Sequence, residues 1–322
     1  MALWLNDATL RRLLPMADLI QAMRAALLSF SAGNVRQPVR SVIEIDSAPS
    51  FLASMPAFAP ELPALGAKLV SVFVGNASLG LPSHSATVIL LDPATGALLA
   101  VLDAAYITEA RTAAVSALAV EALAVPETPV LAVLGSGVQA GSHIEALPHV
   151  RHFTEIRCWS PTAAHLQHFC HGFTHVKVEP AHSAEAAVRG ADVIVLATSS
   201  PMPVIQNAWV KEGACVISVG ACRPNQRESD PDLVTRAAVY VDARASALTE
   251  SGDIVQGIAE GRFTASHLRA ELGELLADPT LGPRNPDEVI LFKSLGLAVE
   301  DLAAAHLAYT RATATCEGVQ LA

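Results

Sequence analysis

The chain has 322 residues with a formal net charge of −10, and 52% of its residues are hydrophobic, 16% charged and 5% aromatic. This composition is that of a globular protein, and the length suits one large domain or two ordinary ones. The acidic residues are spread along the chain rather than gathered in blocks. Duplex nucleic acid and anionic membrane surfaces are therefore poor candidate partners, because both require a basic face.

The most apolar stretches are too short for a membrane-spanning helix. Four acidic residues interrupt them before about 18 apolar residues accumulate: Asp92, Asp103, Glu121 and Glu127. The first residues mix apolar side chains with Asp7, Arg11 and Arg12, whereas a secretory signal needs a basic start and an uninterrupted apolar stretch. The five cysteines form no Cys-x-x-Cys pair, which suits reduced thiols. We therefore expect a cytoplasmic protein.

The first third of the chain predicts helices followed by antiparallel strands. From 6 to 32 apolar residues recur every three or four positions, and Pro15 separates a short helix from a longer one. Between 39 and 103 short β-type runs are broken by glycine and proline. The clearest hairpin joins 87–91 to 97–102 through an Asp-Pro-Ala-Thr-Gly turn.

The middle of the chain predicts a parallel sheet. A helix that begins near Ile107 and ends before Pro126 would link two domains. Strands and helices then alternate, a pattern that gives a parallel sheet covered on both faces. The expected strands are 130–134, 155–159, 192–197 and 214–219, and the expected helices are 138–147, 161–170 and 183–188. Residues 233–312 are expected to be mostly helical, with one possible strand at 238–241.

A glycine-rich turn directly follows the first of these strands. Gly135 permits a tight turn, Gly137 lets the backbone approach a pyrophosphate, and the small Ala140 lets helix and strand pack closely. The pyrophosphate would meet the N-terminus of the next helix. The sequence therefore predicts a dinucleotide-binding domain, since a bare turn would not need a strand before it and a helix after it.

The end of the second strand bears on which dinucleotide is bound. An Asp or Glu there would hydrogen-bond the adenosine ribose of NAD, but this strand runs into Ser160, Pro161 and Thr162. Two hydroxyls and a helix N-terminus suit a 2′-phosphate, although no Arg follows the strand. We expect NADP(H) to be favoured, with NAD(H) still possible.

Three histidines lie three residues apart on the next helix, at His165, His168 and His171. They have no carboxylate or thiol companions in register, and Gly172 follows them directly. A solvated helix face is therefore a better interpretation than a metal site, and we expect no metal.

These motifs resemble the ornithine cyclodeaminase and mu-crystallin family along nearly the whole chain, with the ketimine reductase branch most similar. Ten short segments match in one order: Gln37-Pro-Val-Arg40, Met55-Pro-Ala57, Lys68-Leu-Val70, Pro82-Ser-His84, Arg111-Thr-Ala-Ala-Val-Ser-Ala117, Gly135-Ser-Gly-Val-Gln-Ala140, Gly190-Ala-Asp-Val-Ile194, Val219-Gly-Ala221, Glu250-Ser-Gly-Asp253 and Phe292-Lys-Ser-Leu-Gly296.

The resemblance implies an α/β protein in which a Rossmann domain with a doubly wound parallel sheet, residues 118–292, is inserted into an α+β domain. That second domain, residues 1–117 with 293–322, would bind the substrate and build a homodimer. The implied partners are a small imino acid and a second copy of the chain.

The resemblance also assigns roles to individual residues. Arg40, Lys68 and Arg111 would hold the substrate carboxylate, and guanidinium forks suit that task. Lys68 is the expected proton donor, if burial and neighbouring cations lower its pKa. The other expected substrate-site residues are Glu250, to support the imine nitrogen, and His84, Arg223 and Ser294. The expected cofactor contacts are Ser83, His84, Arg111, Gly135, Ser136, Gly137, Val138, Gln139, Ala140, Ser160, Thr162, Thr198 and Val219.

One departure from the family pattern bears on the reaction. Cyclodeaminases and related alanine dehydrogenases carry an Asp where this chain has Cys222, and the ketimine reductase branch also lacks that Asp. A carboxylate there would stabilise cationic nitrogen, by several kcal/mol. We therefore expect reduction of cyclic ketimine acids, such as 1-pyrroline-2-carboxylate or 1-piperideine-2-carboxylate, with NAD(P)H. The alternatives are a cyclodeaminase or amino-acid dehydrogenase, and an NADPH-regulated binding protein of the mu-crystallin type with little turnover.

Overall fold

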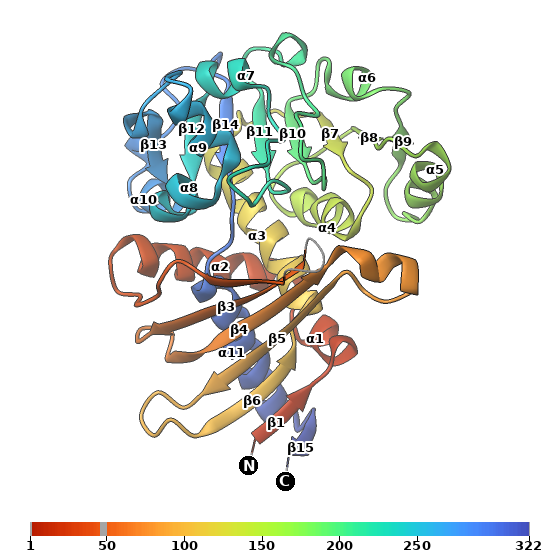
Figure 1. Cartoon of the computed structure of the whole chain (residues 1–322). Coiled ribbons are helices and arrows are strands. Elements are labelled where there is room, and N and C mark those ends of the chain that lie inside the picture. The colour runs from red at the N-terminus through yellow and green to blue at the C-terminus, as the bar shows by residue number, and fades with distance from the viewer. Residues whose placement is uncertain (1, 46–49, 322) are drawn as a thin grey trace. The chain divides into compact units, whose positions relative to one another are not determined.

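A computed structural model describes residues 2–45 and 50–321 of the chain (Figure 1). It divides into two compact units, one of residues 1–111 with 296–322 and one of residues 112–295. The sequence placed these boundaries after Ala117 and Phe292 instead. The helix that links the units accounts for the first difference, because Arg111 in its second turn forms ion pairs with the C-terminal helix of the first unit.

The first unit is built on a seven-stranded sheet with the order β15-β1-β6-β5-β4-β3-β2. Its strands are β1 (Ala2–Leu5), β2 (Ser41–Ile45), β3 (Ser50–Ala59), β4 (Ala64–Phe73), β5 (His84–Leu91), β6 (Leu98–Asp103) and β15 (Val319–Leu321). Its helices are α1 (Asp7–Leu13), α2 (Met16–Ser31), α11 (Ala298–Thr315), the first turns of α3 (Ala105–Leu123) and the 3₁₀ helix η1 (Val74–Leu79). The predicted hairpin is confirmed, because β5 and β6 pair antiparallel.

The two faces of this sheet differ. Alternate residues of a strand point to opposite faces, and on one face of β4 the residues Ala64, Gly66 and Lys68 are buried. Helix α11 covers this face, where a Cβ added to Gly66 would lie 3.2 Å from Leu302. Figure 1 shows α11 running along the sheet.

The opposite face carries apolar side chains that the rest of the chain leaves partly open. The strand register places Ile43 beside Leu52 and places Leu69 between Ser54 and Thr87. The three apolar side chains in this row are 38% to 63% exposed. Exposed apolar side chains that lie together on one face are typical of a surface that another protein covers.

The second unit holds an eight-stranded sheet with the order β13-β12-β14-β11-β10-β7-β8-β9, and all of its pairs are parallel. The strands are β7 (Val130–Leu134), β8 (Glu155–Trp159), β9 (Val178–Pro180), β10 (Val193–Leu196), β11 (Cys215–Ser218), β12 (Ala238–Val241), β13 (Leu268–Glu271) and β14 (Ile290–Lys293). The helices are α4 (Val138–Ala146), α5 (Ala163–His171), α6 (Ala184–Val188), α7 (Pro231–Arg236), α8 (Arg244–Glu250), α9 (Gly252–Ala259) and α10 (Leu272–Ala277), with most of α3.

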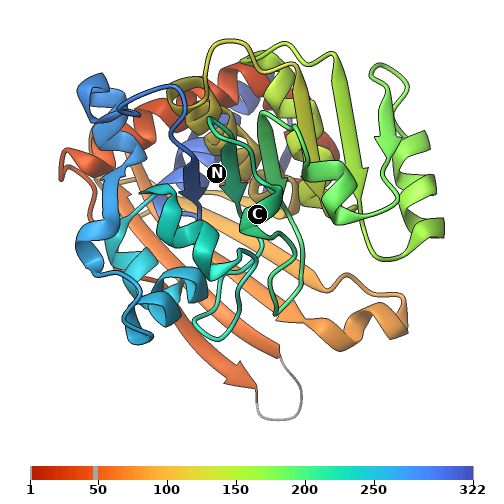
Figure 2. The ribbon, with the colours of Figure 1, turned by 90° about the horizontal axis from the view of Figure 1, so that it is seen from above.

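This topology is the doubly wound Rossmann arrangement that the sequence predicted. The chain moves outward from β7 in both directions, through β8 to β9 and through β10 to β11, so helices cover both faces (Figure 2). Strands β10, β11 and β14 are buried on both sides, which explains their unbroken apolar runs. The order reverses between β7 and β10, and ligands bind at such a point.

Several short strands were not predicted. The region from 233 to 312 was expected to be mostly helical, yet it contains β13 and β14 as well as the predicted β12. Strand β13 has the sequence Leu-Arg-Ala-Glu and β14 has the sequence Ile-Leu-Phe-Lys. Segments of four residues are too short for their apolar pattern to decide between a strand and a helix. Strands β1, β9 and β15 are similarly short.

No single helix among the described residues is long and apolar enough to cross a membrane. The pair α1 and α2 reaches that length only together, and the two helices are bent by 85° at the break that contains Pro15. Helix α2 buries Leu19, Met23 and Leu27 inside its unit.

Candidate functional site

The glycine-rich turn of the second unit begins at the end of β7. Gly135 has φ of +126°, and a Cβ there would lie 2.2 Å from the carbonyl oxygen of Ala197 at the end of β10. Its backbone N–H donates to the carbonyl of Trp159 at 2.8 Å. Only glycine fits a turn held between two strand ends in this conformation.

Gly137 has the opposite surroundings. It is the N-cap of α4, and a Cβ added there would meet no protein atom within 4 Å. The next side chain, Val138, is 66% exposed, whereas Ala140 is buried against the sheet. The turn therefore presents open space at the N-terminus of a helix, which fits a dinucleotide pyrophosphate.

A buried histidine that the sequence reasoning missed anchors the first turn of α4. His143 Nδ1 lies 2.7 Å from the carbonyl oxygen of Gln139, and Nε2 lies 2.8 Å from Ser116 Oγ. Burial lowers the pKa of His143 to about 4, so the ring is neutral. Because the carbonyl can only accept, Nδ1 donates to it and Nε2 accepts from Ser116. This bond fixes the backbone of Gln139, one of the predicted cofactor contacts.

The end of β8 carries hydroxyls and no carboxylate. Ser160 is 8% exposed, and Thr162 is the N-cap of α5 without a side-chain capping bond. Ser136 of the glycine-rich turn lies 2.9 Å from Nδ1 of His165, through its Oγ. The three helical histidines are exposed, and the described residues contain no group of three side chains suited to a metal.

The remaining predicted residues of this unit lie in several places. Thr198, just after β10, donates to Glu228, a buried carboxylate that the sequence reasoning missed. Val219 and Arg223 follow β11, and Glu250 ends α8. Ser294 is buried, and its hydroxyl donates to Asp242 at 3.2 Å, so its side chain supports the fold.

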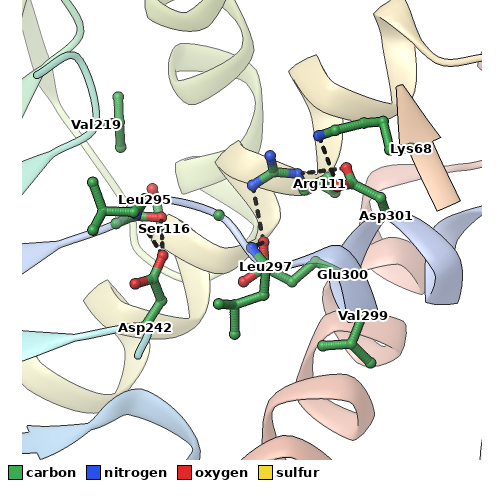
Figure 3. Close-up of polar contacts among 12 residues, drawn as sticks. Lys68, Arg111, Ser116, Val219, Asp242, Leu295, Leu297, Val299, Glu300 and Asp301 are labelled. Atoms are coloured by element: carbon green, nitrogen blue, oxygen red, sulfur yellow. Dashed lines mark hydrogen bonds and ion pairs between the residues drawn. The ribbon is translucent and has the colours of Figure 1, made fainter. Parts of the chain in front are cut away.

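In the first unit, Lys68 and Arg111 meet at a single carboxylate (Figure 3). Lys68 Nζ lies 2.7 Å from one oxygen of Asp301, and Arg111 Nε lies 3.0 Å from the other. Arg111 Nη1 also pairs with Glu300 at 2.9 Å. All four side chains are buried, so the cluster is desolvated.

This cluster sets the charge state of Lys68. Burial lowers the pKa of Lys68 to about 8, the Asp301 carboxylate opposes that shift, and the Arg111 and Arg40 guanidinium groups add to it. Burial raises the pKa of Asp301, but Lys68 and Arg111 together hold it below its ordinary value. Lys68 is therefore a buried amine that exchanges its proton close to neutral pH.

Arg40 differs from Arg111 in its surroundings. It is half-buried just before β2, and its Nη2 donates to the carbonyl oxygen of Gly296 at 3.1 Å. Gly296 has φ of +82°, and a Cβ there would lie 2.5 Å from Arg111 Nη1. Gly296 thus brings Arg40 and Arg111 to the same turn before α11. Ser83 and the exposed His84 lie apart from this cluster, at the start of β5.

Asp301 and Glu300 were not predicted. Both stand in the first turn of α11, where acidic residues also stabilise a helix N-terminus. Their place in the first turn of a helix is therefore explained without any ion pair. The sequence does not predict the pairing with Arg111, because 190 residues separate Arg111 from Asp301.

Comparisons with known proteins agree with this geometry. A sequence profile of the ornithine cyclodeaminase/mu-crystallin family matches residues 4–315. Ketimine reductase mu-crystallin of Mus musculus is 42% identical over 294 residues, which cover 90% of this chain and 91% of that protein. Delta(1)-pyrroline-2-carboxylate reductase of Bacillus cereus is 33% identical over 306 residues, 94% of each chain. The structure of the Thermococcus litoralis reductase of that name, in complex with NADH and L-proline, has a TM-score of 0.96 at 33% identity and covers 99% of this chain and 100% of its own.

The open space at Gly137 gives a first prediction. Gly137→Val should abolish NADH and NADPH binding in a calorimetric titration, because the added side chain occupies the space of the pyrophosphate. The melting temperature should stay near that of the wild type, because a Cβ at this position meets no protein atom within 4 Å. Gly141→Ala in the same helix, where the added Cβ makes ordinary contacts with Phe169 and Phe173, is the control and should bind normally. Unchanged binding by Gly137→Val would contradict the assignment of this turn.

Proposed function

The chain belongs to the ornithine cyclodeaminase/mu-crystallin family, and we propose that it is an NAD(P)H-dependent ketimine reductase. Its substrates would be cyclic ketimine acids, 1-pyrroline-2-carboxylate or 1-piperideine-2-carboxylate, and its products L-proline or L-pipecolate. The observation that carries this proposal is the buried Lys68 amine, paired with Asp301 beside two guanidinium groups. The activities named for the similar proteins of Mus musculus and Bacillus cereus support it.

The cofactor would be held by the residues of the second unit that surround the glycine-rich turn. When bound, the reduced nicotinamide supplies a hydride equivalent to a C=N carbon. Gly135, Gly137 and the first N–H groups of α4 would hold the pyrophosphate. Ser160 and Thr162 favour NADP(H) over NAD(H), because their hydroxyls can donate hydrogen bonds to a 2′-phosphate and no carboxylate at this strand end repels it.

The residues of the first unit would bind and protonate the imino acid. Arg40 holds the carboxylate with its planar guanidinium, which fixes the orientation of the ring. Lys68 donates a proton to the imine nitrogen, which makes the ring carbon electrophilic, and then recovers a proton from solvent. A pKa of about 8 lets Lys68 be mostly protonated at pH 7 and still release its proton readily.

Cys222 argues for reduction rather than deamination. Its thiol is half-buried and donates to the carbonyl oxygen of Val219 at 3.4 Å. A thiol does not replace a carboxylate well in stabilising a cationic nitrogen that forms from an amine. The carboxylate that would do so is absent from this position.

A second copy of the chain would cover the open face of the first sheet. That face presents Ile43, Leu52 and Leu69, and their neighbours in the strand register include serine and threonine. Two identical faces of this kind form a self-complementary interface, as a two-fold dimer requires.

The direct test of the proposed activity is a spectrophotometric assay of cofactor oxidation. Purified protein with NADPH should reduce 1-pyrroline-2-carboxylate or 1-piperideine-2-carboxylate, and NADPH should support a higher kcat/KM than NADH. Ornithine with NADP⁺ should release ammonia slowly or not at all. Rapid ammonia release would favour the cyclodeaminase, and cofactor binding without turnover of either imine would favour a binding protein.

The two arginines should respond differently to substitution. Arg40→Met should raise the KM for the imino acid about 10- to 150-fold, since a charge-assisted hydrogen bond contributes about 1.5–3 kcal/mol. NADPH affinity should not change. Arg40→Lys should also be impaired, because an ammonium lacks the planar fork.

Arg111→Met is expected to lower stability instead. It would leave two buried carboxylates without their guanidinium, a change that costs about 3–5 kcal/mol. Denaturant titration of both variants separates the two effects. If Arg40→Met is strongly destabilised, the assignment of Arg40 to substrate binding is contradicted.

The pKa of Lys68 predicts the pH dependence of the reaction. The protonated amine is the active form, so kcat/KM should be constant below pH 8 and should fall as pH rises above about 8. If the fall reports the titration of Lys68, the five- and six-membered imines should show it at the same pH. Lys68→Met should react slowly and should lose this fall. If the pH of the fall differs between the two ring sizes, the fall reports the titration of the substrate instead.

The oligomeric state tests the dimer. The wild type should sediment as a dimer, and Leu69→Lys should sediment as a folded monomer, because each copy would place a charged ammonium in the apolar interface. Circular dichroism checks the fold of the variant. A dimer that persists in Leu69→Lys and in Leu52→Lys would place the interface elsewhere.

A further inference from the structure

Glu228 is a fully buried carboxylate at the end of the parallel sheet of the second unit. Its Oε1 accepts hydrogen bonds from the backbone N–H and the hydroxyl of Thr198, both at 2.8 Å. Its Oε2 accepts from the N–H groups of Gly220 at 2.7 Å and Ala221 at 3.1 Å, and from the Ser218 hydroxyl at 3.3 Å. One side chain thus receives five hydrogen bonds from the ends of two neighbouring strands.

These two strand ends lie beside the turn that would hold the pyrophosphate. Thr198 follows β10, and Gly220 follows β11. In a doubly wound sheet, the half that begins at β7 binds one nucleotide, and the half on the other side of the switch point binds the second. With the adenosine half at β7 and β8, the loops after β10 and β11 belong to the nicotinamide half.

The contacts leave little freedom around the carboxylate. A Cβ added to Gly220 would lie 2.2 Å from Glu228 Oε1 and 2.2 Å from the carbonyl oxygen of Thr198. The close approach of the two loops therefore depends on a glycine at 220 and on the carboxylate between the loops.

The direction of each hydrogen bond is fixed by its donor. Backbone N–H groups can only donate, so both oxygens of Glu228 must accept, as in an ionised carboxylate. Lys293 Nζ lies 3.0 Å from Ser218 Oγ, so it donates to that hydroxyl, which in turn donates to Glu228. Burial raises the pKa of Glu228, and the Lys293 ammonium opposes that rise.

Lys293 connects the carboxylate to a further segment. Its ammonium lies 3.5 Å from Asp253, and the other oxygen of Asp253 accepts from the N–H of Ser229 at 3.0 Å. The motifs at 219–221, 250–253 and 292–296 are therefore linked through Glu228, Ser218 and Lys293.

We propose that Glu228 is a positioning residue that locks the loops after β10 and β11 in the arrangement that receives the nicotinamide end of the cofactor. The proposal rests on the proposed function, since it concerns the cofactor of that reaction. Glu228 acts through Thr198, Gly220 and Ala221 and does not itself touch a reacting atom. The adenosine end, held by other strands, does not depend on Glu228.

Glu228→Gln tests this proposal, because the amide keeps the shape and removes one acceptor. In either orientation of the amide, its NH₂ group faces a backbone N–H of one of the two loops. Two donors cannot form a hydrogen bond, so the contact to that loop is lost. The matched control is Asp192→Asn. Asp192 is also a buried carboxylate of this sheet, and it accepts from Val130 N–H at 2.8 Å and pairs with Lys211, but it lies where β7 and β10 begin, at the other end of these strands.

Calorimetric titration should compare NADH with ADP-ribose, which lacks the nicotinamide. In Glu228→Gln the Kd of NADH should rise about ten-fold, as expected when a buried hydrogen-bond network loses one acceptor. The Kd of ADP-ribose should stay within about two-fold of the wild type, and the primary isotope effect with 4-deuterated NADH should increase. Asp192→Asn should lower the melting temperature and leave both the ratio of the two Kd values and the isotope effect unchanged.

Equal loss of NADH and ADP-ribose binding in Glu228→Gln, or the same pattern in Asp192→Asn, would overturn the proposal. If Glu228→Gln does not fold, Ser218→Ala removes one of the five hydrogen bonds and should change the ratio of Kd values in the same direction, and an unchanged ratio would count against the proposal. Failure of the wild type to bind either nicotinamide cofactor would instead overturn the proposed function.

Discussion

The first unit depends on the pairing of buried charges. Lys68 from β4 and Arg111 from α3 are removed from water, and each would be strongly unfavourable without the carboxylates of α11. Asp301 receives both cations, and Glu300 receives the second guanidinium nitrogen while it caps its own helix. The need to pair these buried charges therefore holds α11, the last helix of the chain, against β4 and α3.

The same cluster gives the unit its chemical character. A lone buried lysine would lose its proton, and a fully compensated one would keep it far above neutral pH. Lys68 lies between these limits because one carboxylate opposes burial and two guanidinium groups. On the proposed function, the ion pairs that stabilise the fold are therefore also those that adjust a proton donor.

The second unit meets a similar requirement with backbone groups. Its parallel strands end in N–H groups that need acceptors when they are buried. After β7, the glycine-rich turn places the N-terminus of α4 beside open space that suits a ligand. After β10 and β11, the N–H groups of Thr198 and Gly220 donate instead to Glu228. One part of the strand edge thus remains available for a phosphate, and the neighbouring part is held rigid.

Local sequence signals predicted much of this fold. The hairpin at β5 and β6, the break at Pro15 and the turn at 135–140 each depend on residues that are close in sequence. The strands β13 and β14 were missed because each has only four residues, which are too few to show a period. Asp301, Glu300 and Glu228 were missed for a different reason: each acts through partners that only the folded chain brings near. A buried acidic residue in a helix or a loop has no local signature of its partner.

The thiol at Cys222 has consequences for the two directions of the proposed reaction. Oxidation of an amine builds positive charge on nitrogen as hydride leaves, so a nearby carboxylate would lower that barrier. Reduction starts from a protonated imine, and the same carboxylate would stabilise this ground state more than the transition state, which slows the step. The absence of a carboxylate at this position therefore disfavours a reaction that starts from the amine and leaves the protonated imine reactive. On the proposed function, the charge that binds the substrate lies at its carboxylate end, at Arg40, and does not change during the reaction.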